Sequence, residues 1–245
     1  MILCIDSSGL TASTAIIDEE NDVAVAEYTV NLKKTHSETL LPMIDEMYRL
    51  TGLNKKDTTA VAIAAGPGSF TGLRIGGATA KGIASALNIP VIPIPTVDGL
   101  AYNCYGYDGY VCPIMDARRN QTYTGIYSFR KTLNDNVYGY EMETELRQCA
   151  VDIGEVISRI NKLGKAVVFL GDGVPVFRRT LDDELTVAHT YAPMGLNRQN
   201  AVSIGRLGVK LYREGKGVSA ASFAPEYLRQ SQAERELKEG EKTNE

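Results

Sequence analysis

Residues 65–77 read Ala65-Gly66-Pro67-Gly68-Ser69-Phe70-Thr71-Gly72-Leu73-Arg74-Ile75-Gly76-Gly77 and join an apolar, strand-like run to a helix-like one. Five glycines in this stretch let the backbone approach another group closely. Successive amides in a strand-to-helix turn can cradle an anion, with help from the helix dipole. The glycines can equally make a tight turn and a smooth helix face for close packing. On glycine count alone, packing is the favoured interpretation.

The standard phosphate-binding motifs do not occur in this stretch. Gly72 is followed by Leu73 and Arg74 instead of the Lys and Ser/Thr of a P-loop, and the glycine spacing is not Gly-x-Gly-x-x-Gly. A residual nucleotide or anion site could still combine the turn with the end of the first strand. Its candidate residues are Asp6, Ser7, Ser8, Gly66, Gly68 and Ser69.

The composition of the 245 residues favours a globular protein with a sizeable core, because 44% of them are hydrophobic. The net charge is −4, and no run of Lys and Arg is interleaved with aromatic residues, so tight direct binding of nucleic acid is not expected. Four cysteines lie far apart in the chain, which indicates reduced thiols in a cytoplasmic protein. The first six residues predict a strand and neither a signal peptide nor a membrane span.

Hydrophobic periodicity predicts the order βββαβαβ for the first part of the chain. Strands are expected at 2–5, at about 12–17, at 23–30, at 60–65 and at 90–94, and helices at 36–51 and 73–87. Pro42 falls near the beginning of the first helix, where Thr35 or Ser37 can supply the cap. A last helix is expected at 200–212.

The second half of the chain repeats the pattern of the first. Each half opens with an apolar strand that ends at an acid, Asp6 or Asp116, and later contains a strand that runs into a glycine turn at Gly66 or Gly171. Such a tandem repeat predicts two α/β lobes, each a sheet with helices on its faces. We expect an N-terminal lobe over 1–100, completed by a helix from about 200–214, and a C-terminal lobe over 101–199. The charged residues 229–245 predict a flexible tail.

Several segments resemble the bacterial TsaB family of tRNA threonylcarbamoyladenosine biosynthesis proteins. They are residues 2–8, 36–42, 66–76 and 225–229, and the resemblance covers essentially the whole chain. It implies duplicated actin-like (ribonuclease H-like) lobes. It also implies a non-catalytic partner of the transferase TsaD, which transfers a threonylcarbamoyl group to adenosine 37 of tRNA. The small ATPase TsaE completes the implied assembly, and tRNA would be met only through the complex.

The resemblance further implies that helices 36–51 and 73–87 pack against the corresponding pair of TsaD. The same surface would serve self-association, so a homodimer is expected when the chain is alone. The expected contact residues are Leu41, Ile44, Met47, Tyr48, Ile75, Ala78, Thr79, Gly82 and Ile83, with Met47 and Tyr48 at the centre. The alternative is that both apolar helix faces are consumed by packing on their own sheet.

Catalytic groups are scarce in this chain. Its two histidines, His36 and His189, are far apart, so converging imidazole ligands for a transition metal are not expected. The resemblance aligns residues 96–100, Thr-Val-Asp-Gly-Leu, with the His-x-Glu-Gly-His stretch of the transferase. It implies no cofactor of the chain's own, with ATP or ADP conceivable at the partner junction. The alternative function is an actin-like ATPase or small-molecule kinase, in which Asp6 or Asp116 would hold Mg²⁺. A glycoprotease-like metalloenzyme lacks its ligands.

Overall fold

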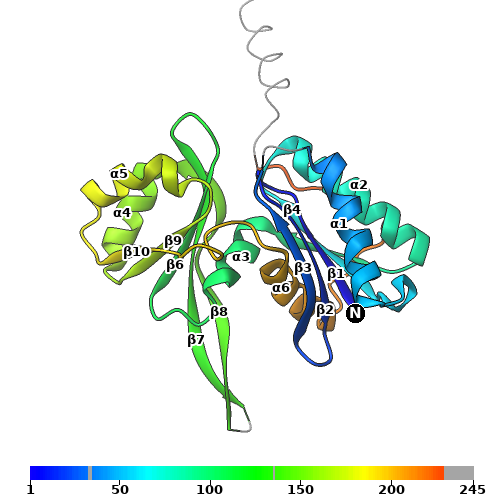
Figure 1. The fold of residues 1–245 in the computed structure, drawn as a ribbon. Coiled ribbons are helices and arrows are strands. Elements are labelled where there is room, and N and C mark those ends of the chain that lie inside the picture. Colours follow the sequence, from blue (N-terminus) through cyan, green and yellow to red (C-terminus); the bar gives the residue numbers. More distant parts are fainter. Residues whose placement is uncertain (33–34, 135, 229–245) are drawn as a thin grey trace, which may run out of the picture.

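The computed structural model describes residues 1–32, 35–134 and 136–228, which form two lobes (Figure 1). The first lobe is a mixed five-stranded sheet in the order β3-β2-β1-β4-β5. Its strands are β1 (Ile2–Asp6), β2 (Ala12–Asp18), β3 (Val23–Val30), β4 (Ala60–Gly66) and β5 (Val91–Pro95). Helices α1 (His36–Thr51) and α2 (Phe70–Leu87) cover its outer face, and the short helix η1 (Lys55–Asp57) precedes β4.

The second lobe repeats this topology in the order β10-β9-β6-β7-β8. Its strands are β6 (Tyr110–Asp116), β7 (Gln121–Asn134), β8 (Val137–Asp152), β9 (Val167–Leu170) and β10 (His189–Tyr191), with helices α4 (Ile153–Leu163) and α5 (Val174–Glu184) outside. In each lobe the first strand is antiparallel to the second and parallel to the strand that runs into the glycine turn. This matching order confirms the predicted duplicated α/β fold.

The two inner sheet faces share one hydrophobic core. Helices α3 (Thr96–Ala101) and α6 (Ala201–Arg213) lie between the sheets, with η2 (Tyr102–Cys104) after α3 (Figure 1). A single cluster of buried side chains joins Ile94 of β5, Ile204 of α6 and Met115 of β6. The lobes are therefore held together by packing as well as by the chain.

The helices that cover the first sheet follow the sequence prediction closely. Helix α1 has the predicted bounds, but its N-cap Thr35 makes no side-chain cap bond. Helix α2 begins at Phe70, earlier than the predicted Leu73, because the Ser69 hydroxyl accepts a hydrogen bond from the Gly72 amide and caps it.

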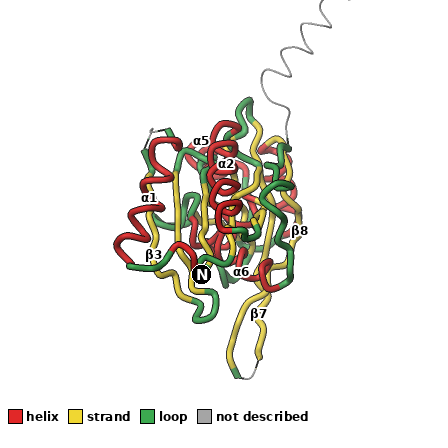
Figure 2. Tube along the Cα trace, turned by 90° about the vertical axis from the view of Figure 1, so that its right-hand side faces the viewer, coloured by secondary structure: helices red, strands yellow, loops and turns green. Residues whose placement is uncertain are grey.

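The β7–β8 ribbon was not predicted from the sequence. It extends beyond the body of the second lobe (Figure 2). The tail predicted over 229–245 lies outside the described residues. Across the described ranges, no helix combines the length and the apolar character that a membrane crossing requires.

Candidate functional site

The glycine run packs against the turn between β1 and β2, residues 7–10, which we call the cleft turn. A Cβ on Gly68 would overlap the carbonyl oxygen of Ser8, and a Cβ on Gly76 would overlap the Ser7 hydroxyl. A Cβ on Gly72 would overlap the carbonyl oxygen of Ser7. The glycines are therefore explained by the close approach of α2 to the first strand.

Several amides that could have held an anion have partners within the chain. The Ser69 amide donates to the Ser8 carbonyl at 2.6 Å, and the Gly66 amide donates to Thr96 Oγ1 at 3.0 Å. The structure thus brings the six candidate anion-site residues together, but their polar groups bond to one another and to Gly72 and Thr96. Anion binding at this turn stays a prediction.

Asp6 is buried at the end of β1, and its carboxylate forms local hydrogen bonds. One of its carboxylate oxygens accepts hydrogen bonds from the Ser8 amide at 2.9 Å and the Ser8 hydroxyl at 2.6 Å. Burial raises the pKa of Asp6 to about 6, the Ser8 hydrogen bonds oppose this, and the charge of Asp172 adds to it. This arrangement is an Asx-turn, which stabilises the cleft turn.

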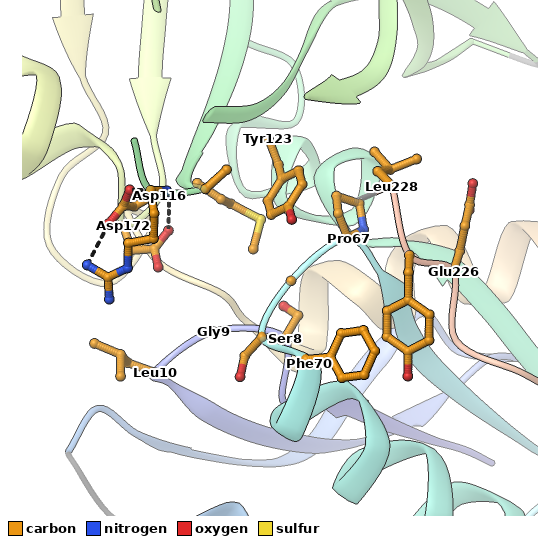
Figure 3. A pocket seen from close by; sticks show the side chains of 16 residues that line it. Ser8, Gly9, Leu10, Pro67, Phe70, Asp116, Tyr123, Asp172, Glu226 and Leu228 are labelled. Atoms are coloured by element: carbon orange, nitrogen blue, oxygen red, sulfur yellow. Dashed lines mark hydrogen bonds and ion pairs between the residues drawn. The ribbon is translucent and has the colours of Figure 1, made fainter. Parts of the chain in front are cut away.

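A cleft of about 580 Å³ opens between the lobes beside this turn (Figure 3). Asp116 and Asp172 line it from the second lobe, and Glu226 lines it from the C-terminal segment. Among the described residues of its lining, Arg118 is the one cation, and its guanidinium pairs with Asp116 at 3.1 Å. Burial raises the pKa of Asp172 above its ordinary value. The surplus of carboxylates disfavours the phosphates of a nucleotide that carries no bound cation.

One wall of the cleft is made by residues 225–228, which the sequence analysis did not assign to any site. The Glu226 amide donates to the Ala65 carbonyl at 2.7 Å. The Tyr227 ring stacks on Phe70 with 4.1 Å between centroids, and the Arg74 guanidinium lies 4.3 Å from the Phe70 ring centroid. The sequence did contain a signal for this wall, because the segment belongs to the stretch 225–229 that carries the family resemblance. Its position against α2 joins residues far apart in the chain, so it could not be predicted from the local sequence.

The residues considered for a metal centre have structural partners. His36 Nε2 lies 2.8 Å from the Gly9 carbonyl oxygen, and His189 Nε2 lies 3.1 Å from an Asp182 oxygen in the other lobe. Within the described part of the chain, no three His, Cys, Asp or Glu side chains are grouped so that they could hold a metal ion.

The stretch 96–100 is built into the junction of the lobes. Thr96 Oγ1 accepts from the Gly66 amide, Leu100 is buried, and Asp98 accepts a hydrogen bond from the Tyr127 hydroxyl at 2.6 Å. Burial raises the pKa of Asp98, and the Tyr127 hydrogen bond only partly offsets this. These side chains hold the two lobes together through polar and apolar contacts.

An apolar groove of about 660 Å³ runs between α1 and α2, and we call it the α1–α2 groove. Its main lining residues are Leu41, Pro42, Ile44, Tyr48, Ile83 and Leu87. The Leu41 side chain is 56% exposed. Among the described residues, the charged members of its lining are Asp45 and Lys55, which form an ion pair with each other at 2.5 Å.

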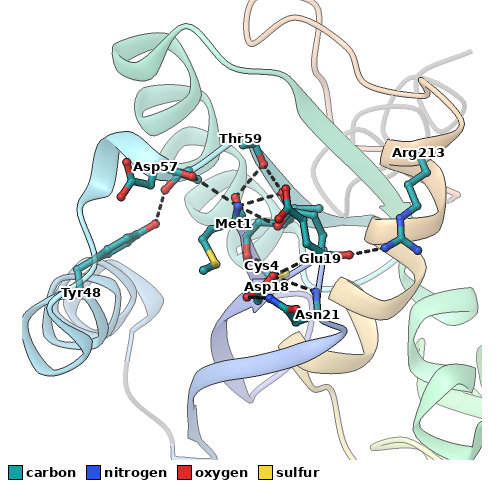
Figure 4. Close-up of polar contacts among 12 residues, drawn as sticks. Met1, Cys4, Asp18, Glu19, Asn21, Tyr48, Asp57, Thr59 and Arg213 are labelled. Carbon is teal, nitrogen blue, oxygen red and sulfur yellow. Dashed lines mark hydrogen bonds and ion pairs between the residues drawn. The ribbon is translucent and has the colours of Figure 1, made fainter.

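Of the predicted contact residues, Leu41, Ile44, Tyr48 and Ile83 line this groove. Leu41, Ala78 and Gly82 are exposed, Ile75, Thr79 and Ile83 are partly exposed, and Ile44, Met47 and Tyr48 are buried. Met47 has no exposed surface and its sulfur lies 3.7 Å from Thr14 Oγ1 under the helix. Tyr48 is 6% exposed, and its hydroxyl lies 2.6 Å from Thr58 Oγ1 (Figure 4). Met47 is fully buried, which argues against it as a contact residue, whereas Tyr48 also lines the α1–α2 groove. A contact centre at Met47 and Tyr48 stays a prediction.

Comparisons with known proteins agree along nearly the whole chain. The model of a family described as TsaD, tRNA N6-adenosine threonylcarbamoyltransferase, matches residues 25–237. The chain is 30% identical over 241 residues to the tRNA threonylcarbamoyladenosine biosynthesis protein TsaB of Bacillus subtilis (strain 168), covering 98% of this chain and 99% of that protein. It is 27% identical over 238 residues to the protein of the same name from Escherichia coli (strain K12), covering 96% and 97%.

Solved structures show the same fold. The crystal structure of an uncharacterized protein from Pseudomonas aeruginosa with similarity to peptidase YeaZ matches with a TM-score of 0.75 at 24% identity, covering 93% of this chain and 99% of that one. A structure of YeaZ from the same organism matches with a TM-score of 0.74. Both support the two-lobe architecture described above.

Proposed function

This chain belongs to the TsaB family of tRNA threonylcarbamoyladenosine biosynthesis proteins, and we propose that it is a non-catalytic subunit that binds and activates a TsaD-like transferase. The observation that carries this proposal is the α1–α2 groove, an apolar surface on the outside of the first lobe. Exposed apolar surface of this kind marks protein contacts in soluble proteins. The relatives' names support the pathway, and the groove supports docking.

The groove has the chemistry of an interface centre. Leu41 and Pro42 line it from α1, and Ile83 and Ala86 line it from α2. The two charged residues of its described lining, Asp45 and Lys55, are paired with each other. A stable interface buries on the order of 1,200–2,000 Å² in total, with a few central side chains carrying most of the energy. An apolar side chain from a partner helix would fill the groove without leaving a buried charge unpaired.

The non-catalytic role is supported by the residues at the positions considered for catalysis, which have structural contacts. The glycines of the turn allow close packing, and Asp6 stabilises the cleft turn. Asp98 forms a hydrogen bond across the junction of the lobes. Docking would then act by favouring the binding-competent state of the transferase over its alternatives. A TsaE-like ATPase and tRNA would join through the complex in the cytoplasm, and ATP or ADP would bind only at the junction.

Titration calorimetry with the purified transferase tests the docking surface. We expect Leu41→Asp to weaken binding about a hundredfold or more, because a carboxylate would be buried without a partner. Leu50→Asp is the matched control, since Leu50 lies on the same helix, is 60% exposed and does not line the groove. Equal affinities of the wild type and Leu41→Asp would place docking elsewhere. The same substitution should shift any homodimer to monomer.

The inter-lobe cleft supports one alternative function, a nucleotide-dependent ATPase or kinase. Its position between two duplicated lobes, beside an acid at the end of β1, is the observation that favours this rival. Calorimetric titration of the isolated chain with Mg-ATP discriminates the two. We expect no tight binding, and tight binding would favour the rival.

A further inference from the structure

We propose that His36 is a positioning residue of the docking surface, which holds the first turn of α1 to the cleft turn and thereby sets the position of Leu41. This inference rests on the proposed function, because it concerns the same α1–α2 groove. It assigns to a half-buried imidazole a role outside metal binding. It also links the groove to a turn that lines the inter-lobe cleft.

The beginning of α1 lacks two of the supports that a helix end normally has. Thr35 is the N-cap residue, but its side chain caps no amide. Pro42 lies inside the helix and has no amide hydrogen to donate to the carbonyl of Glu38. The first turn therefore has fewer hydrogen bonds than a regular helix end, and a contact from outside helps to orient it.

His36, the first residue of α1, supplies that contact. Its Nε2 lies 2.8 Å from the Gly9 carbonyl oxygen, which can only accept, so the ring donates from Nε2. Its Nδ1 is buried and has no hydrogen-bond partner among the described residues. The ring edge also abuts the beginning of α2, since a Cβ on Gly72 would lie 3.2 Å from His36 Cδ2. The imidazole thus touches both docking helices and the cleft turn.

The cleft turn is itself held firmly, so it can serve as an anchor. The Ser8 carbonyl accepts from the Ser69 amide, and the Ser7 hydroxyl donates to the Gly72 carbonyl at 2.9 Å, which fixes α2 to the same turn. On the other side, the Gln199 amide is 1% exposed and lies where a Cβ of Gly9 would be. A displacement of this turn would move α1 relative to α2 and change the groove.

Binding of the transferase to purified variants tests the role of His36. We expect His36→Leu to weaken binding about tenfold, the equivalent of one lost hydrogen bond. His36→Gln can place its amide Nε2 near the same position and donate to Gly9, so binding should return to within about threefold of the wild type. Calorimetry reports on the folded chain, and a modest loss of stability leaves nearly all molecules folded. A purely structural role would therefore lower the melting temperature without changing the affinity.

Gly9→Ala tests the same link from the cleft side, and it keeps the proposal testable if His36→Leu does not fold. Its Cβ would press on the Gln199 amide and displace the turn. Binding should weaken in Gly9→Ala and recover when Gln199→Ala is added. Wild-type affinity in both His36→Leu and Gly9→Ala, with Leu41→Asp still defective, would overturn this inference alone. A wild-type chain that does not bind the transferase would overturn the proposed function as well.

Discussion

Asp6 stands at the end of β1, the position at which the alternative ATPase function would need Mg²⁺. Among the described residues, its carboxylate accepts hydrogen bonds only from Ser8. Its pKa of about 6 in the folded chain lies above the ordinary 3.8, because the charged form is costly when buried. The folded chain therefore binds the Asp6 proton more tightly than the unfolded chain.

The stability of the protein should depend on pH through this group. A raised carboxyl pKa gives stability that is present below about pH 4 and is lost as the pH rises through about 6. Asp6→Asn removes the titration and keeps an oxygen acceptor for Ser8. The free energy of unfolding of Asp6→Asn relative to the wild type should rise by on the order of 3 kcal/mol between pH 4 and pH 7.

Urea unfolding at a series of pH values measures this difference. Asp22→Asn is the control, because Asp22 is exposed in the β2–β3 turn, and its curve should follow that of the wild type. A difference between Asp6→Asn and the wild type that does not change with pH would refute the assignment.

Among the helices, α2 depends most on its glycines. Gly76→Ala should destabilise the fold by about 1–3 kcal/mol, because the new Cβ would overlap the Ser7 hydroxyl. When Ser7→Ala is already present, the same substitution should cost much less. Gly82→Ala is the matched control on the same helix, where nothing lies within 4 Å of the added Cβ. It should stabilise by about 0.5–1 kcal/mol through helix propensity.

Chemical unfolding of the four chains in the double-mutant cycle provides the measurement. If Gly76→Ala is as well tolerated as Gly82→Ala, close packing is not the reason for the glycine run. Equal costs of Gly76→Ala with and without Ser7 would point to another neighbour.

Helix α1 shows which features of a helix could be predicted from the sequence. Its bounds followed from apolar periodicity and agree with the structure. Periodicity could not tell which apolar side chains face the sheet, so Met47 was placed at the interface although it lies in the core. The groove depends on the position of Ile83 and Leu87 of α2 beside Leu41 of α1, which the periodicity of either helix alone does not predict. The cleft wall at residues 225–228 depends on contacts between segments far apart in the chain, such as Glu226 with Ala65, and no local pattern reports them.

The whole molecule is two copies of one lobe joined by a mostly apolar core. Duplication was predictable because each lobe repeats an acid at the end of its first strand and a glycine turn after its fourth. The Tyr127–Asp98 hydrogen bond, which links β7 of the second lobe to α3, was not predictable, because neither residue belongs to a repeated pattern. A Cβ on Gly125 would overlap the Tyr127 hydroxyl, so a glycine at this position leaves room for the hydroxyl that forms the bond.

Removal of that hydroxyl should weaken the junction of the lobes. Tyr127→Phe leaves the largely buried Asp98 carboxylate without its donor and should cost about 1–3 kcal/mol at pH 7. The cost should shrink at acidic pH, where Asp98 is protonated and neutral. Urea unfolding at both pH values checks this. Tyr138→Phe is the control, since Tyr138 is 63% exposed on the ribbon. A loss that is the same at both pH values would exclude Asp98 as the cause.

The central claim is that this chain contributes a docking surface and performs no turnover itself. Reconstitution of threonylcarbamoyl transfer to tRNA, with and without this chain, tests it most directly. We expect no modified nucleoside from the chain alone, full activity when it is added to the TsaD-like transferase and its ATPase, and loss of that stimulation with Leu41→Asp. Modified nucleoside formed by the chain alone, or unchanged activity when it is omitted, would contradict the account.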